Sequence, residues 1–340
     1  MNAVQLRNID DFVNSFELAD SLGGQTFLIT GATGLIGSSL IHCLVALKRN
    51  IKIIAPVRNL SKAQELFPEP SDFLHFIECD ISNFNYDSLG TIDYVIHCAA
   101  PTSSKFFVEK PVETFNIIYR CSANLLEFSR RNPIKGMVFL SSLEVYGTIL
   151  DDSSYITEDV QGYLDPMSVR SSYPMAKRAT ENLCHLYAKE YGLPVKVARL
   201  TQTTGAGIAK DDNRIIAQFA RLAAQKQNII LHSTGESARP YCYLTDCISA
   251  LLYILLKGTS GEAYNVANEE TYISAKGMAE YLKKNFSPEI QVIININENM
   301  GYAPTTKQKL SSAKLQALGW KPKFGLNEIF SDLIEYIQSA

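Results

Sequence analysis

The sequence predicts an α/β fold in which a doubly wound parallel sheet is joined to a smaller mixed α/β lobe. From Gln25 onward, short apolar runs alternate with stretches of helical pattern, such as Ser38–Leu47. Strand–helix alternation gives a parallel sheet covered on both faces, because each crossover lays a helix against the sheet. The predicted strands are Thr26–Thr30, Ile51–Val57, Leu74–Glu78, Tyr94–Cys98, Met137–Ser141 and Val195–Leu200.

The chain divides into three predicted regions. Residues 1–24 have the spacing of an amphipathic helix that packs on the edge of the next domain. Residues 25–200 contain the strand–helix alternation. Residues 201–340 mix short strands and helices, and we expect this smaller lobe to be interleaved with the sheet domain because no linker-like tract separates the two.

Composition narrows the range of partners. The chain has 340 residues, of which 46% are hydrophobic and 20% charged, so it can bury a sizeable core. Its formal net charge is -3 and it has no long basic run, so no nucleic-acid partner is expected.

The cysteines and the apolar runs indicate a cytoplasmic protein. The seven cysteines form no CxxC pair, which favours buried thiols in a reducing compartment and argues against a structural metal. No apolar run approaches the roughly 20 residues that span a bilayer. The N-terminus carries early acids and lacks the apolar centre of a signal peptide, so no membrane association is expected.

A glycine-rich turn predicts a dinucleotide site of the Rossmann type. Gly31, Gly34 and Gly37 follow a strand and open a helix in the segment FLITGATGLIGSSL. The first glycine permits the tight turn, the second admits a pyrophosphate, and the third lets helix and strand pack closely. Thr33, Leu35 and Ile36 complete the turn, where helix-terminal N–H groups would face the phosphates.

The ends of the neighbouring strands supply further candidate cofactor contacts. Asp80 ends FIECD and can accept a hydrogen bond from adenine or cap the next helix, and Ile81 follows it. Ala99 and Ala100, in YVIHCAAP, are small enough to let a ribose pass.

The end of the second strand leaves the choice of cofactor open. An NAD site tends to have an acid there for the ribose 2′-hydroxyl, whereas this chain has Pro56 followed by Arg58. An arginine can hold a 2′-phosphate bidentately, and it can also be a solvated surface residue. We expect NAD, with NADP as the alternative.

A Ser, Tyr and Lys set predicts catalysis. Ser142 and Glu144 lie in FLSSLEVYG, and Tyr173 and Lys177 lie four residues apart in SSYPMAKRATENL, a spacing that puts both on one face of a helix. A nearby ammonium lowers the pKa of a phenol, normally near 10, by favouring the phenolate, so the tyrosine can act as a base. Ser142 would hydrogen-bond the substrate oxygen that becomes a carbonyl.

This ordered set resembles the NAD-dependent epimerase/dehydratase family, extended short-chain dehydrogenases that act on nucleotide sugars. The resemblance covers about residues 25–285 and includes RLTQTTGAG and RPYCYLTD of the substrate lobe. The nearest subgroup pattern is that of UDP-glucuronate decarboxylase. The shared features are AAP, SSLEVYG and GYLDPMSVRSSYPMAKRATENLC, which holds Arg170 shortly before Tyr173.

The resemblance implies roles for individual residues. Ser142, Tyr173 and Lys177 take the catalytic roles, and the latter two also contact the cofactor. Glu144 becomes the acid/base at C5 of the sugar. The implied substrate contacts are Ser142, Gln202 near the diphosphate, Arg214 and Arg239 on the diphosphate and sugar, and His232 against the base.

The sequence also departs from the family pattern. The 4,6-dehydratases carry an Asp before the Glu, and here Leu143 stands at that position, so dehydration is disfavoured. TQTTGAG and GESAR replace the more usual NxYGP and GxQTR.

Three functions remain open at this point. The first is a nucleotide-sugar decarboxylase or epimerase that works through a 4-keto intermediate in polysaccharide precursor synthesis. The second is an NADPH-dependent 4-keto-6-deoxysugar reductase, which Arg58 favours. The third is a non-catalytic nucleotide-binding protein. The resemblance further implies a homodimer through two helices per subunit, one of them at about residues 174–191.

Overall fold

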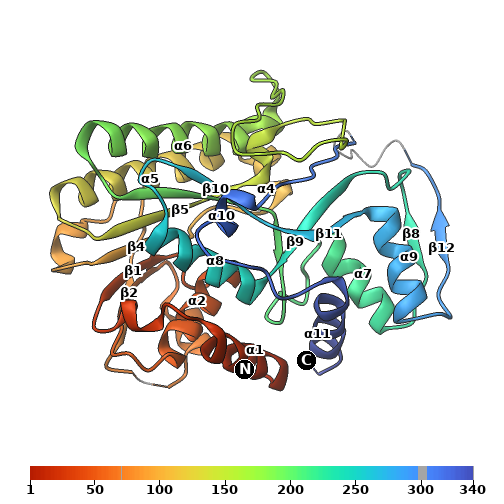
Figure 1. Cartoon of the computed structure of the whole chain (residues 1–340), viewed down its shortest axis with the longest axis horizontal. Coiled ribbons are helices and arrows are strands. Elements are labelled where there is room, and N and C mark those ends of the chain that lie inside the picture. The colour runs from red at the N-terminus through yellow and green to blue at the C-terminus, as the bar shows by residue number, and fades with distance from the viewer. Residues whose placement is uncertain (70, 298–304, 340) are drawn as a thin grey trace.

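A seven-stranded parallel sheet forms the centre of the molecule (Figure 1). The computed structural model describes residues 1–69, 71–297 and 305–339. In the order β10-β6-β5-β4-β1-β2-β3, the strands are Ala263–Val266, Val195–Leu200, Gly136–Ser142, Tyr94–His97, Thr26–Thr30, Lys52–Val57 and Leu74–Glu78. All six pairings are parallel, which confirms the predicted sheet.

Helices cover both faces of this sheet, because successive residues of each buried strand point to opposite sides. Phe27 and Ile29 of β1 pack in one core with α2 (Leu35–Ala46) and α8 (Leu244–Lys257). Leu28 lies in a second core, with α5 (Pro111–Arg131) and α6 (Ser172–Tyr191). The shorter helices α3 (Leu60–Leu66) and α4 (Ser104–Glu109) follow β2 and β4.

A smaller lobe is built on two further sheets. The first has the order β11-β9-β7, formed by Asn268–Ser274, Ala238–Tyr243 and Gln202–Thr204; the second pairs β12 (Val292–Ile294) with β8 (Ile229–Leu231). Their core is closed by α7 (Ile215–Ala224), α9 (Ala275–Asn285) and α11 (Leu326–Gln338).

After residue 200 the chain passes back and forth between the two lobes. Within residues 201–340, α8 packs on the main sheet and β10 is its edge strand next to β6, and the short α10 (Ala313–Gln316) packs on β10 and α8. Residues 201–340 are therefore interleaved with the sheet domain and are not one contiguous unit.

The N-terminal helix α1 (Ala3–Ser15) connects the two lobes. It packs against α2 and α8 on the sheet side and against α11 of the smaller lobe. Buried Asn8 donates to the Tyr243 hydroxyl at 2.6 Å, and that hydroxyl donates to Asp332 at 2.8 Å. At the chain ends, the Asn2 amide donates to the Ser339 hydroxyl at 2.9 Å, so both termini lie together (Figure 1).

Candidate active site

The glycine turn between β1 and α2 has the shape of a phosphate cradle. Gly31 has φ 72°, and a Cβ there would lie 2.8 Å from the backbone nitrogen of Ala99. A Cβ on Gly37 would lie 2.2 Å from the carbonyl oxygen of Gly31. Only glycine permits these approaches of the turn to β4 and of α2 to the turn.

The first turn of α2 leaves its backbone donors free for a ligand. Gly34 is exposed and caps the helix without a side-chain hydrogen bond, so the N–H groups of Leu35, Ile36 and Gly37 have no partner within the helix. Such a helix N-terminus attracts phosphate. The turn, with half-buried Thr33, therefore fits the pyrophosphate of a dinucleotide.

The remaining predicted cofactor contacts lie at the carboxyl ends of neighbouring parallel strands, where ligands of such sheets bind. Ala99 and Ala100 follow β4 and are half-buried. After β3, Asp80 accepts the Ser82 N–H at 2.9 Å, a bond that lowers the pKa of the carboxyl. Ile81 beside it is buried.

Arg58 is exposed at the end of β2. Its charge contributes to lowering the pKa of Asp80, so the two side chains lie near each other. This placement is compatible with a cofactor contact and equally with a solvated arginine.

His97 of β4 is a packed core residue. It is 1% exposed, with its Nδ1 2.6 Å from the Thr30 hydroxyl and its Nε2 3.1 Å from the Ser122 hydroxyl. Burial lowers its pKa to about 3. The neutral ring thus joins β1, β4 and α5 beneath the glycine turn.

Tyr173 and Lys177 both lie buried at the start of α6. The Lys177 ammonium is 5.7 Å from the centre of the Tyr173 ring and donates to the Leu140 carbonyl at 2.6 Å. Burial lowers the pKa of Lys177 to about 8. The Tyr173 ring stacks on Phe107 of α4, with ring centres 4.3 Å apart.

The ionisation of Tyr173 differs from the expectation drawn from the sequence. Burial raises the pKa of the phenol and nearby Glu144 raises it further, while a hydrogen bond with Ser142 and the charge of Arg170 act in the opposite direction. The expected lowering by Lys177 is therefore wrong for the protein by itself, because desolvation of the phenolate is the largest effect.

Ser142 and Glu144 reach the same place from the end of β5. The Ser142 hydroxyl accepts the Glu144 N–H at 3.2 Å where the chain enters a 3₁₀ turn, Leu143–Tyr146. Both carboxylate oxygens of Glu144 lie 3.0 Å from Nη2 of Arg170, which precedes α6. The side chain of Leu143 is buried. The structure thus brings Ser142, Glu144 and Tyr173 together.

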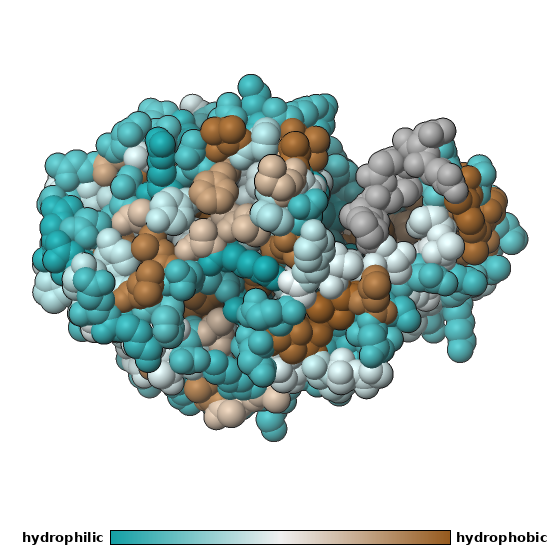
Figure 2. Space-filling model, turned by 90° about the horizontal axis from the view of Figure 1, so that it is seen from above, coloured by the Kyte–Doolittle hydropathy of each residue, from teal (hydrophilic) through white to brown (hydrophobic). Residues whose placement is uncertain are grey.

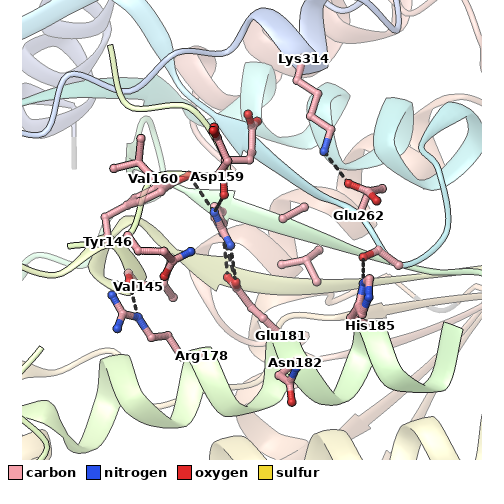
Figure 3. A pocket seen from close by; sticks show the side chains of 16 residues that line it. Val145, Tyr146, Asp159, Val160, Arg178, Glu181, Asn182, His185, Glu262 and Lys314 are labelled. Atoms are coloured by element: carbon pink, nitrogen blue, oxygen red, sulfur yellow. Dashed lines mark hydrogen bonds and ion pairs between the residues drawn. The ribbon is translucent and has the colours of Figure 1, made fainter. Parts of the chain in front are cut away.

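Two residues that sequence reasoning missed hold this 3₁₀ turn. Gln308 donates to the carbonyls of Leu143 and Gly147 at 3.3 and 3.2 Å, and Arg178 donates to the Val145 carbonyl at 2.6 Å (Figure 3). The position of Arg178 beside Lys177 was a signal that could have been used. Gln308, which follows Gly147 by 161 residues, carried no such signal.

The cavity beside α6 shown in Figure 3 contains none of the predicted site residues. It holds about 600 Å³ and is lined by polar groups that are largely paired with one another. Arg199 pairs with Glu181 at 2.8 Å, and Lys314 pairs with Glu262 at 2.9 Å. These pairs connect α6 to β6 and β10 to α10.

Of the five predicted substrate contacts, Gln202, Arg214 and Arg239 gather in the smaller lobe. Gln202 follows β6, whose Leu200 pairs with Ser142, and its buried Oε1 has no hydrogen-bond partner among the described residues. Burial raises the pKa of Tyr241, and the charges of Arg239 and Arg214 act in the opposite direction, so both arginines lie near this residue. Tyr241 pairs with Gln202 between strands β9 and β7.

Two of the predicted substrate contacts, Arg214 and His232, are less favourably placed to bind a ligand. Arg214 is already paired with Asp212 at 2.6 Å and donates to the Thr203 carbonyl, so a ligand would have to share it. His232 follows β8, and its Nδ1 lies 3.2 Å from the Asn295 carbonyl oxygen. Within the described residues, no hydrogen bond or ion pair joins His232 to Gln202, Arg214 or Arg239.

Within the described part of the chain, no group of three or more His, Cys, Asp or Glu side chains could hold a metal ion. None of its helices is long and apolar enough to cross a membrane.

Comparisons with known proteins agree with this geometry. Over 304 residues the chain is 27% identical to UDP-glucuronic acid decarboxylase 6 of Arabidopsis thaliana, covering 88% of this chain and 85% of the relative. Its fold is similar to UDP-glucose 4-epimerase of Thermotoga maritima, with a TM-score of 0.79, 24% identity, and 93% and 99% of the two chains covered. UDP-glucuronic acid 4-epimerase of Bacillus cereus gives a TM-score of 0.78 at 21% identity, with the same coverage.

A protein-family model also matches this chain over much of its length. Residues 27–267 match the model described as the NAD dependent epimerase/dehydratase family, which confirms the resemblance and agrees with NAD as the expected cofactor. The chain belongs to the NAD dependent epimerase/dehydratase family.

Proposed function

We propose that the protein modifies the sugar of a nucleotide sugar through a 4-keto intermediate, with decarboxylation of UDP-glucuronate as the leading reaction and C4 epimerisation as the alternative. The observation that carries the proposal is the meeting of Ser142, Glu144 and Tyr173 beside the glycine cradle. Relatives named as UDP-glucuronic acid decarboxylases over most of the chain support it.

The catalytic residues divide the chemistry between them. Tyr173 takes the proton of the C4 hydroxyl, and Ser142 hydrogen-bonds the same oxygen as it becomes a carbonyl. NAD, which the glycine cradle at Gly31, Gly34 and Gly37 would hold, would supply a reversible hydride acceptor for C4. Tyr173 must be a phenolate to take the C4 hydroxyl proton, and the nearby Lys177 ammonium would act against the desolvation that raises the pKa of the phenol.

The fate of the ketone depends on the substituent at C5. A C6 carboxylate next to a C4 ketone belongs to a β-keto acid. It loses carbon dioxide, and the electron pair of the broken bond moves into an enolate across C5 and C4. Glu144, a carboxylate paired with Arg170, would take up a proton from solvent and pass it to C5. Buried, apolar Leu143 cannot protonate a leaving C6 hydroxyl, which disfavours dehydration.

The test is incubation of the purified protein with a panel of nucleotide sugars, including UDP-glucuronate and 4-keto-6-deoxy sugars, read by mass spectrometry. A product lighter by the mass of carbon dioxide supports decarboxylation, and an isomer of unchanged mass supports epimerisation. Tightly held NAD in the extracted protein supports a cofactor that is recycled.

Two other functions predict different outcomes. A 4-ketoreductase, favoured by exposed Arg58, would consume NADPH and yield a product heavier by two hydrogens. A non-catalytic nucleotide-binding protein would bind nucleotide sugars and change none of them.

The proposal extends to assembly and location. Helices α5 and α6 pack together, and their outer sides carry exposed Val112 and Leu186 and the ring pair Phe115–Tyr119. Figure 2 looks down on the α6 side of the molecule and shows apolar patches among polar ones. We expect a homodimer through these helices, which light scattering would detect, and a cytoplasmic place in polysaccharide precursor synthesis, which cell fractionation would test.

A further inference from the structure

Arg170 has an unusual position at the candidate active site. It lies in the 3₁₀ turn Val169–Ser171, directly before α6, and its guanidinium is 5.0 Å from the centre of the Phe107 ring. On its edge, Nη2 lies 3.0 Å from each carboxylate oxygen of Glu144. Phe107 also stacks on Tyr173, so Arg170 is held beside both proposed proton-transfer residues.

The guanidinium retains donors that the protein does not use. An arginine has five N–H groups, and within the described residues only Nη2 of Arg170 makes a hydrogen bond. Arg199 and Arg214, by contrast, donate from Nε, Nη1 and Nη2 to protein acceptors. The side chain of Arg170 is 36% exposed, so a ligand can reach it.

The free donors match a carboxylate better than a hydroxyl. A planar guanidinium fork binds a carboxylate through two parallel hydrogen bonds, and the contact with the Phe107 ring helps to hold the guanidinium of Arg170 in place. Leu143, which precedes Glu144 in the chain, is apolar and buried, so it offers no second charge that could compete for the substrate carboxylate.

The proposed chemistry places an acidic group of the substrate at this point. If Glu144 serves C5 of the sugar, the C6 substituent is one bond away from the atom that Glu144 serves. A carboxylate at C6 would meet Glu144 as a like charge, and the guanidinium already paired with Glu144 is the group that can offset both charges.

We propose that Arg170 binds the C6 carboxylate of a uronic-acid nucleotide sugar and so selects uronates over neutral hexoses. The inference rests on the proposed function, because that function defines which sugar carbon lies beside Glu144. Arg170 then has two tasks: Nη2 positions Glu144, and the remaining N–H groups bind the substrate.

The experiment is calorimetric titration of the NAD-saturated protein with UDP, UDP-glucose and UDP-glucuronate. Arg170→Met is expected to weaken UDP-glucuronate roughly 10- to 100-fold, because a charge-assisted hydrogen-bonded pair is lost. Binding of UDP and UDP-glucose should stay as in the wild type. Arg170→Lys keeps the positive charge but lacks the planar fork, so its affinity for UDP-glucuronate is expected to lie between those of the wild type and Arg170→Met.

The chain offers a matched control in Arg130. This arginine is also paired with a glutamate, Glu127, at 2.7 Å and also lies over an aromatic ring, that of Tyr191 at 5.2 Å. Its exposure, 38%, is close to that of Arg170. Arg130→Met is expected to leave all three affinities unchanged. NAD binding and thermal melting verify that each variant folds.

The outcomes separate this inference from the function on which it depends. Equal weakening of all three ligands in Arg170→Met, or unchanged affinity for UDP-glucuronate with slower exchange of the C5 hydrogen, overturns carboxylate recognition and leaves Arg170 as a positioning residue only. A wild-type protein that binds UDP-glucuronate no better than UDP and converts no nucleotide sugar overturns the proposed function, and the inference with it.

Discussion

The proposed cofactor side and the proposed substrate side of the site differ in how their functional groups are held. On the cofactor side, backbone packs on backbone at Gly31 and Gly37, and Tyr173 and Lys177 are buried at the start of α6, which covers the main sheet. On the substrate side, Arg214 and His232 are held by side-chain pairs and loop carbonyls near the surface. A buried site of fixed shape suits a reaction step that is the same for many substrates. Ion pairs near the surface, which can be exchanged for contacts with a ligand, suit the recognition of one particular substrate.

The largest expected effect lies on the cofactor side. Tyr173→Phe removes the proposed base and should lower turnover by roughly 10²- to 10⁴-fold, with NAD affinity nearly intact. Tyr187→Phe, on the same helix, changes a hydroxyl bound to Glu127 and should leave turnover unchanged. Wild-type turnover in Tyr173→Phe would refute the mechanism, and steady-state kinetics measures it.

The burial of Lys177 predicts a pH dependence of stability. Its pKa is about 8 in the folded protein against 10.5 when unperturbed, so between these values the unfolded chain holds a proton that the folded protein has released. Lys177 by itself therefore adds about 3 kcal/mol to the free energy of unfolding as the pH rises through this window, whereas the buried thiols, whose pKa values burial raises, act in the opposite direction.

Denaturant titrations of the wild type and of Lys177→Met at pH 7 and pH 10 test that contribution. The change in the free energy of unfolding between the two pH values should be less positive in Lys177→Met by about 3 kcal/mol. Lys189→Met, an exposed position on the same helix, should change with pH as the wild type does. Equal changes in the wild type and Lys177→Met would contradict the burial argument.

A third test concerns the close backbone approach at the cradle. Gly37→Ala places a methyl group 2.2 Å from the Gly31 carbonyl oxygen and should cost about 1–3 kcal/mol of stability and weaken NAD binding. Gly23→Ala is the control, because its nearest contact is 3.4 Å and it should stay within about 0.5 kcal/mol. Similar denaturation midpoints for both variants would show that α2 is not held as tightly as described.

The smallest of the four effects is expected on the substrate side. Arg239→Met should weaken binding of the nucleotide sugar about tenfold without changing NAD affinity or the folded state. Lys226→Met, which removes a surface pair with Glu289 in the same lobe, should change neither affinity. Titrations of Arg239→Met with NAD and with the nucleotide sugar measure both affinities. An equal loss of affinity for NAD would contradict the separation of the cofactor side from the substrate side.

The same contrast explains what the sequence could predict. β1, β3 and β6 have the predicted bounds, and the glycine turn and the Tyr173/Lys177 spacing are local patterns whose geometry follows from one strand or one helix. α2 begins at Leu35, ahead of the predicted Ser38, because the glycine turn itself forms its first turn.

Long-range contacts could not be predicted in this way. β10 is a four-residue strand that joins the main sheet only by pairing with β6, and Gln308 reaches Leu143 across 165 residues. The raised pKa of Tyr173 depends on Phe107 and the surrounding core, and spacing along α6 contains no information about burial.

The meeting of the termini has a consequence for how the chain can be rearranged. Asn2 and Ser339 lie within hydrogen-bonding distance, so a short linker could join the ends into a ring. New ends could then be opened at an exposed loop such as that of Gly90, which has no neighbour within 4 Å of an added Cβ. Such a circular permutant should retain the fold, because α1 and α11 would remain packed while the order of the lobes along the chain changed.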